Sequence, residues 1–144
     1  MSVKVIADTG ILVALIDRRD DYYTWSLQMS MLYKSPFYTC DAVIAEAAYM
    51  LNSTLGAEGV ITLMRMIENN TVRVDFDVSH HAKRIADLIR KYDSLRMDYA
   101  DACIVVMTEQ EKYHDCVVLT VDRKDFSVYR RHGRSQIPFV APDF

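Results

Sequence analysis

The sequence predicts an α/β fold, a three-layer α/β/α sandwich around a central, mainly parallel sheet. Short apolar runs alternate along the chain with segments whose apolar residues recur at helical spacing. Strands separated by helices imply crossover connections, which join parallel strands and cover both faces of the sheet. With 144 residues and 51% hydrophobic residues, the chain fits a single domain spanning residues 1–144.

The first half of the chain is predicted to contain two strands and four helices. Residues 3–7 are a short apolar run that ends at Asp8, which is typical of a buried strand. Residues 10–17, 21–33 and 57–69 are interpreted as helices. Residues 36–40 are interpreted as a strand, and Asp41 is expected to cap a helix that extends to about Asn52.

The second half continues the alternation. Residues 71–76 alternate like a strand, and an apolar stripe predicts a helix at residues 79–92. Residues 98–113 are predicted to form a helix that is apolar on nearly every side, and therefore buried. Strands at residues 116–121 and 138–140 complete the sheet.

Composition narrows the class of protein. No apolar run approaches the roughly 20 residues of a membrane span, and the first residues lack a signal-peptide pattern, so we expect a cytoplasmic protein without a membrane partner. Cys40, Cys103 and Cys116 are expected to be buried and reduced, and the four histidines lack metal-ligand spacing. The net charge of −3 becomes −3 + 5 = +2 if five candidate site carboxylates are set aside, which is compatible with a phosphodiester substrate.

Acidic residues provide the candidate site. Asp8 and Asp122 follow apolar strands, and ligands bind beyond the carboxyl ends of parallel strands, although a charge there is also an ordinary way to leave the core. On the buried helix, Asp98 and Asp101 share a polar stripe with Thr108 and Lys112. The alternative is that Asp98 is a helix cap and Asp101 a first-turn acid.

Glu46 lies off the centre of the core-facing stripe of its helix, where a solvated glutamate would look the same. Clustered carboxylates repel one another, and hard divalent cations with a preference for oxygen ligands relieve that repulsion. Mg²⁺ or Mn²⁺ held in this way can activate water for attack on a phosphodiester. Phosphate-loop, dinucleotide-binding, serine-hydrolase and zinc-protease motifs are absent from the sequence.

Four stretches together resemble the PIN-domain family, and in particular VapC-type toxins of toxin–antitoxin pairs. They are VIADTGILVAL at residues 5–15, AVIAE at 42–46, MDYADACIV at 97–105 and LTVDRKDF at 119–126. The resemblance covers almost the whole chain in the right order. The interval between Asp101 and Asp122 is longer than in many members, so the resemblance fixes the position of Asp122 less closely than those of the other acids.

The resemblance implies a catalytic quartet of Asp8, Glu46, Asp101 and Asp122. Asp8 and Asp101 would be the principal metal ligands, joined by Asp122 and by Asp98, which would be a secondary ligand or a cap. Thr9 and Thr120 would support the site, and Asp125 would cap a short turn leading to Phe126.

The implied reaction is metal-dependent endonucleolytic cleavage of RNA that leaves a 5′-phosphate and a 3′-hydroxyl. Six basic residues are candidates for contacts with the RNA backbone: Arg96, Arg123, Lys124, Arg130, Arg131 and Arg134. The alternative for each of them is an ordinary solvated surface charge. The family also implies a homodimer and an antitoxin partner. The helix at residues 21–33 offers apolar residues for such a contact, although core packing is the simpler account for several of them: Tyr22, Tyr23, Trp25, Met29, Met31 and Leu32.

Other classes remain as alternatives. A haloacid-dehalogenase-type phosphatase needs a second Asp where Gly10 stands, and a receiver domain needs acids and a lysine that are not in register. A catalytically silent PIN-like RNA-binding or scaffold module would not need the complete quartet. A housekeeping RNA-processing nuclease would share the chemistry and differ in biological role.

Overall fold

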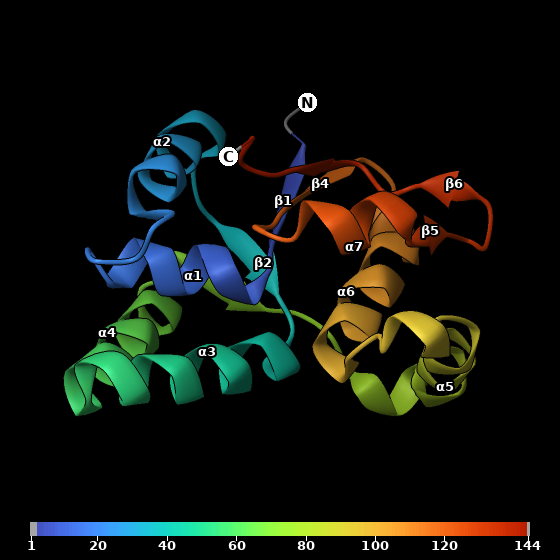
Figure 1. The fold of residues 1–144 in the computed structure, drawn as a ribbon, viewed down its shortest axis with the longest axis horizontal. Helices are drawn as coiled ribbons and strands as arrows, with labels where there is room; N and C mark the ends of the chain where they lie inside the picture. The colour runs from blue at the N-terminus through green and yellow to red at the C-terminus, as the bar shows by residue number, and fades with distance from the viewer. Residues whose placement is uncertain (1–2, 144) are drawn as a thin grey trace.

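The computed structural model describes residues 3–143 and has a five-stranded sheet at its centre (Figure 1). The strands are β1 (Lys4–Ala7), β2 (Phe37–Thr39), β3 (Val72–Val74), β4 (Cys116–Leu119) and β7 (Phe139–Val140). Their order across the sheet is β3-β2-β1-β4-β7, and every neighbouring pair is parallel. All five strands therefore present their carboxyl ends at one edge, with β1 in the middle.

Helices cover both faces of the sheet, which confirms the predicted three-layer sandwich. One layer contains α1 (Thr9–Ile16), α2 (Tyr23–Tyr33), α3 (Asp41–Leu55) and α4 (Ala57–Glu68), and the other contains α5 (Ala82–Lys91), α6 (Tyr99–Glu109) and α7 (Arg123–Val128) (Figure 1). Short 3-10 turns lie at Val78–His80, Asp93–Leu95 and Glu111–Tyr113. A small antiparallel hairpin joins β5 (Arg130–Arg131) to β6 (Ser135–Gln136).

The core is continuous through the sheet and α6. All four residues of β4 are buried, and so is every residue of α6 from Ala100 to Thr108. An all-round apolar helix is stable only when protein surrounds it, which is the predicted position of this helix. Cys40, Cys103 and Cys116 are free and buried, as predicted. No helix in residues 3–143 has the length and apolar character needed to cross a membrane.

Several predicted boundaries were wrong for local reasons. Asp41 is the first helical residue of α3, and the N-cap position belongs to Cys40. The helix expected at residues 98–113 ends at Glu109 because Gln110 turns to extended backbone and a 3-10 turn follows. The helix expected at residues 79–92 is divided into a 3-10 turn and α5. α7 and the β5–β6 hairpin were not predicted.

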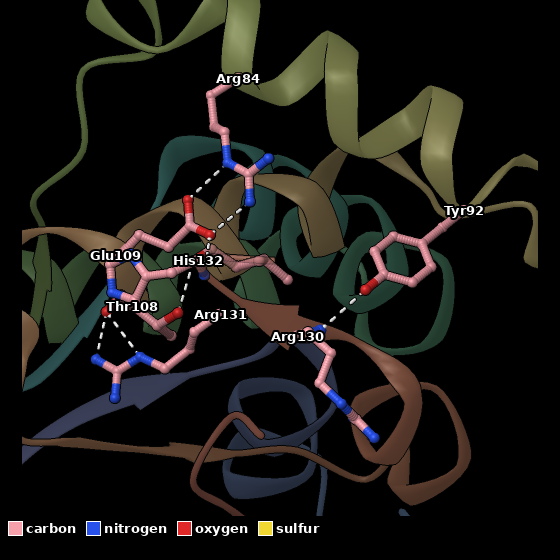
Figure 2. Close-up of polar contacts among 8 residues, drawn as sticks. Arg84, Tyr92, Thr108, Glu109, Arg130, Arg131 and His132 are labelled. Carbon is pink, nitrogen blue, oxygen red and sulfur yellow. Dashed lines mark hydrogen bonds and ion pairs between the residues drawn. The ribbon is translucent and has the colours of Figure 1, made fainter. Parts of the chain in front are cut away.

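Charged contacts hold the hairpin against the end of α6 (Figure 2). Arg84 donates from Nε and Nη2 to the two carboxylate oxygens of Glu109, at 2.9 and 2.7 Å, and the His132 backbone N–H donates to the same carboxylate at 2.6 Å. Arg131 donates to the carbonyl oxygens of Thr108 and Tyr113. Since α7 leads directly into the hairpin, these contacts also fix the position of α7.

Candidate active site

An acidic pocket of about 220 Å³ lies at the carboxyl edge of the sheet, where α1, α6 and α7 begin and beside the middle of α3. All four members of the expected quartet line this pocket, although they are distributed over most of the chain. The full lining is Asp8, Thr9, Gly10, Glu46, Met50, Arg96, Asp98, Asp101, Val121, Asp122 and Asp125. Six of these residues are carboxylates and one is a cation, so the pocket is strongly negative.

Helix capping explains why three of the acids point into the pocket. Asp8 is the N-cap of α1 and accepts a hydrogen bond from the Thr9 backbone N–H at 2.8 Å. Asp98 caps α6 by accepting from the Asp101 N–H at 2.8 Å, and Asp122 caps α7 by accepting from the Asp125 N–H at 3.1 Å. The positive end of a helix dipole favours a carboxylate at these positions, so three helix N-termini stabilise the cluster.

Of the two threonines predicted to support the site, Thr9 lines the pocket and Thr120 contacts two of its acids. Thr120 donates its hydroxyl to Asp8 Oδ2 at 2.7 Å and accepts from the Asp122 backbone N–H at 3.0 Å. One side chain therefore connects the acids that follow β1 and β4. The Thr9 hydroxyl is buried in the pocket wall and has no hydrogen-bond partner among residues 3–143. A buried hydroxyl without a partner is costly, so a ligand or its water in this pocket would relieve it.

Asp101 is the most deeply perturbed acid of the site. Only 8% of the residue is exposed, and Tyr129 donates its hydroxyl to Asp101 Oδ2 at 2.8 Å. Burial, followed by the negative charges of Asp8 and Asp98, raises the pKa of Asp101 to about 8. The hydrogen bond from Tyr129 acts in the opposite direction, because it stabilises the charged carboxylate.

Asp8 shows the same pattern to a smaller extent. Burial raises its pKa to about 6, while the hydrogen bonds from Thr120 and Thr9 lower it and the charges of Glu46 and Asp98 raise it. Burial and neighbouring negative charge thus raise the pKa of two acids in one pocket, a pattern typical of functional sites.

The donor set fits a hard divalent cation. One carboxylate oxygen from each of Asp101, Asp122 and Asp125 lies within 4.8 Å of the others. The acidic groups lining the pocket are all carboxylates, with no cysteine or histidine among them, and oxygen ligands suit Mg²⁺ or Mn²⁺. Asp8, which lines the same pocket, would extend the set.

Two residues of the site were missed or misassigned in the sequence. Asp125 was expected to cap a turn, but Asp122 is the cap, and the Asp125 carboxylate belongs to the acidic trio. The three-residue spacing of Asp122 and Asp125 could have indicated this, since residues i and i+3 share a helix face. Tyr129 had no signal in the sequence, because its contact with Asp101 depends on the path of α7.

Of the other predicted site residues, three line the pocket and one does not. Glu46 is exposed on α3 and Asp98 is exposed at the start of α6, and both line the pocket. Arg96 also lines it and has a left-handed backbone, with φ of 54°. Lys124 is exposed on α7 and does not line the pocket.

The other basic candidates make contacts within the protein. Arg123 donates to the Ala141 carbonyl at 2.7 Å and to Asp143 at 3.1 Å. Arg130 donates to three carbonyls at the end of α7, and Arg131 holds the hairpin in place. Arg134 is exposed in the hairpin turn. In the apolar helix α2, Trp25 is buried, whereas Met31 and Leu32 are 71% and 67% exposed.

Comparison with known proteins defines the class first. The PIN domain family model matches residues 5–131, and the chain belongs to that family.

The chain is similar to proteins named VapC and VapBC, one found by sequence and two by structure. Ribonuclease VapC26 of Mycobacterium tuberculosis is 23% identical over 136 residues, which cover 94% of this chain and 99% of VapC26. The structure of M. tuberculosis VapC20, described as a toxin that cleaves the sarcin-ricin loop, aligns with a TM-score of 0.69 and 16% identity, covering 80% of this chain and 87% of that one. DNA-bound VapBC of Salmonella typhimurium aligns with a TM-score of 0.64 and 18% identity, covering 96% and 98%.

Proposed function

We propose that this protein is a metal-dependent endoribonuclease that hydrolyses RNA phosphodiester bonds. The observation that carries the proposal is the convergence of Asp8, Glu46, Asp101 and Asp122 on one pocket, together with the trio formed by Asp101, Asp122 and Asp125. Membership of the PIN domain family and similarity to a protein named as a ribonuclease support the same reaction.

The acids of the pocket divide into principal metal ligands and further acids around them in this proposal. Asp8 and Asp101 would be the principal ligands of Mg²⁺ or Mn²⁺, with Asp122, Asp98 and Asp125 completing the acidic wall. A bound divalent cation would lower the pKa of water and stabilise negative charge on the phosphodiester. Thr120 keeps Asp8 oriented and Tyr129 keeps Asp101 oriented, so neither carboxylate has to reorganise when RNA binds.

Glu46 and Arg96 lie at the exposed rim of the pocket, where substrate would enter. Glu46 would accept a proton from the attacking water or orient it, and Arg96 would contact a phosphate next to the cleaved bond. Lys124 on α7, with Arg123 and Arg130 if they leave their present partners, would offer further backbone contacts.

The biological role that we propose is that of a cytoplasmic toxin in a type II toxin–antitoxin pair, acting as a homodimer and inhibited by a cognate antitoxin. Similarity to VapC26, VapC20 and VapBC supports this role. A housekeeping nuclease with the same chemistry would not slow bacterial growth when expressed without an antitoxin, which separates the two roles.

The central test is cleavage of mixed RNA by the purified protein in Mg²⁺ or Mn²⁺, with and without a chelator. We expect cleavage that the chelator abolishes and that is lost in Asp101→Asn, because the variant keeps the shape of the side chain but removes its charge. Asp21→Asn, an exposed acid outside the pocket, is the matched control and should cleave like the wild type. Metal-independent cleavage, or full activity of Asp101→Asn, would refute the mechanism, and a folded protein without cleavage would favour the silent scaffold.

A further inference from the structure

Two pockets, each more than twice the volume of the acidic pocket, lie away from it. One, of about 510 Å³, is formed by the start of β1, the end of α2 and the segment before β2, and includes Lys4, Tyr33 and Lys34. The other, of about 490 Å³, lies along β3 and includes Arg73 and Asp75. Tyr38 lines both, so the two pockets adjoin along β2.

The first pocket is basic and aromatic. Lys4 and Lys34 line it, none of its other described lining residues is acidic, and Tyr33 and Tyr38 contribute ring surface. The Lys4 ammonium is held over two rings, 5.5 Å from the centroid of Tyr38 and 5.4 Å from that of Tyr113. Cation–π contacts with two rings hold the ammonium at the pocket, and Asp75 is close enough to interact with its charge.

The second pocket is lined by one cation, Arg73, and one acid, Asp75. Its acid, Asp75, accepts a hydrogen bond from the Lys112 ammonium at 3.0 Å and another from the Tyr113 hydroxyl. The charge of Asp75 is therefore compensated within the protein. Arg73, paired with Tyr38 in the β2–β3 register, is exposed and adds positive charge to the second pocket, next to the residue that the two pockets share.

We propose that this surface, made of Lys4, Tyr33, Lys34, Tyr38 and Arg73, is a second binding site for single-stranded RNA. The inference rests on the proposed function, since RNA is taken as the substrate. Cations that hold the phosphate backbone, next to aromatic rings that contact bases, are the combination that binds single strands without sequence preference. A volume of about 510 Å³ is within the range of small-ligand pockets and is sufficient for one nucleotide.

The site lies at the opposite end of β1 from the acidic pocket. Asp8 follows Lys4 by four positions along extended β1, which places their Cα atoms roughly 13 Å apart at 3.3 Å per residue. A long RNA can therefore occupy both sites, whereas a very short one reaches only one of them. The surface would hold a flanking segment of the substrate while the acidic pocket cleaves elsewhere.

Binding of a fluorescent single-stranded RNA of about 16 nucleotides, measured in chelator, tests the proposal. Without metal the acidic pocket repels RNA, so the basic site should dominate the signal. The double variant Lys4→Gln/Lys34→Gln should bind roughly tenfold more weakly near physiological salt, and the slope of log K against log salt should fall by about 1.4, since each lost phosphate contact contributes about 0.7. Lys83→Gln, a 90% exposed lysine on α5, makes the same change of charge as Lys34→Gln alone and should bind like the wild type.

Further measurements separate this proposal from folding effects and from the proposed function. Lys34→Gln alone, an exposed position, should show about half of the change in slope, so a folding defect caused by loss of Lys4 cannot account for both results. With metal, the double variant should raise KM for the long RNA and leave cleavage of an RNA of about four nucleotides unchanged.

Binding by the double variant equal to that of Lys83→Gln would overturn the proposal even if the protein cleaves RNA. Lysine-dependent binding without any cleavage would refute the nuclease and leave the second site standing. Equal competition by polyglutamate of the same charge would overturn the RNA assignment and indicate an acidic protein segment instead.

Discussion

Tyr129 is a positioning residue whose effect is transmitted through Asp101. Its hydroxyl is buried and donates to one carboxylate oxygen, while its ring packs edge-to-face against Phe126 and Tyr92. Groups that orient a metal ligand in this way affect metal affinity although they do not touch the metal. The hydroxyl and the ring can therefore be tested separately.

Tyr129→Phe should raise the Mn²⁺ concentration needed for half-maximal cleavage by about tenfold while the protein remains folded, because Asp101 loses its orienting donor. The measurement is cleavage rate against Mn²⁺ concentration. Tyr92→Phe is the matched control, since it removes a hydroxyl from the same ring cluster that accepts from the Arg130 N–H and does not contact Asp101. Equal behaviour of the two variants would assign Tyr129 a purely structural role.

The raised pKa of Asp101 makes metal-free stability depend on pH. Its folded pKa of about 8 lies above the ordinary value of 3.8, so the folded protein holds a proton that the unfolded chain releases. Stability is therefore lost as pH rises from about 4 through 8.

Asp101→Asn removes this dependence and keeps an acceptor for the Tyr129 hydroxyl. In chelator, we expect the variant to be more stable than wild type by on the order of 2 kcal/mol above pH 8, with the difference disappearing near pH 4. Urea unfolding at both pH values provides the measurement. A difference that does not change with pH would show that charge repulsion at Asp101 is not the cause.

Three acids of the quartet lie next to a strand end or helix start that the sequence shows, whereas Glu46, inside α3, was indicated only by the resemblance to the PIN-domain family. Asp8 and Asp122 follow apolar strands, and Asp101 follows a helix cap. Asp125 and Tyr129 could not be assigned, because their positions depend on the direction in which α7 leaves the sheet. That direction is set by contacts distant in sequence, such as those of Arg131 with Thr108 and Tyr113.

Among the elements, α1 approaches the segment after β4 very closely at Gly10. A Cβ at this position would lie 2.4 Å from Val121 Cγ2, which is far inside van der Waals contact. Glycine lowers helix stability by about 0.5–1 kcal/mol relative to alanine, so the close approach explains its presence in the first turn. Val121 lies between Thr120 and Asp122, so this contact determines how the two acidic segments pack.

Gly10→Ala should destabilise the protein by about 1–3 kcal/mol through overpacking and should reduce cleavage, because Val121 has to move. Adding Val121→Ala removes the obstructing methyl groups and should recover part of both losses. Denaturant unfolding and the RNA assay measure the two effects. An unchanged single variant, or a double variant that simply adds a second loss, would contradict this account of the contact.

Element prediction succeeded where hydrophobic periodicity was strong, as in β1, β4 and α6. It was wrong where a local contact replaced the periodic pattern. Glu109, held by Arg84 and His132, lies where α6 ends, and six-residue α7 depends on the Asp122 cap rather than on an apolar stripe. The β5–β6 hairpin has two residues in each strand, which is too short for a pattern to be visible.

For the molecule as a whole, the acidic pocket is a source of instability that a divalent cation should remove. An ion that binds the folded protein and not the unfolded chain stabilises it by mass action, by about 2.7 kcal/mol at a concentration one hundred times Kd. We expect Mn²⁺ to raise the melting temperature of the wild type and of Asp21→Asn in a concentration-dependent way. The same titration should have little effect on the double variant Asp8→Asn/Asp101→Asn, and an equal rise in all three proteins would show that Mn²⁺ binds elsewhere.

The capping roles of Asp98 and Asp122 have a consequence for how such a protein could lose its activity over evolution. Asn or Ser at either position would still begin the helix, so a silent descendant could replace the charge there with little cost in folding. Residue 46 carries no such duty, because Glu46 is exposed in the middle of α3. In a lineage released from selection for cleavage, position 46 would therefore drift freely, while positions 98 and 122 would remain restricted to short polar side chains.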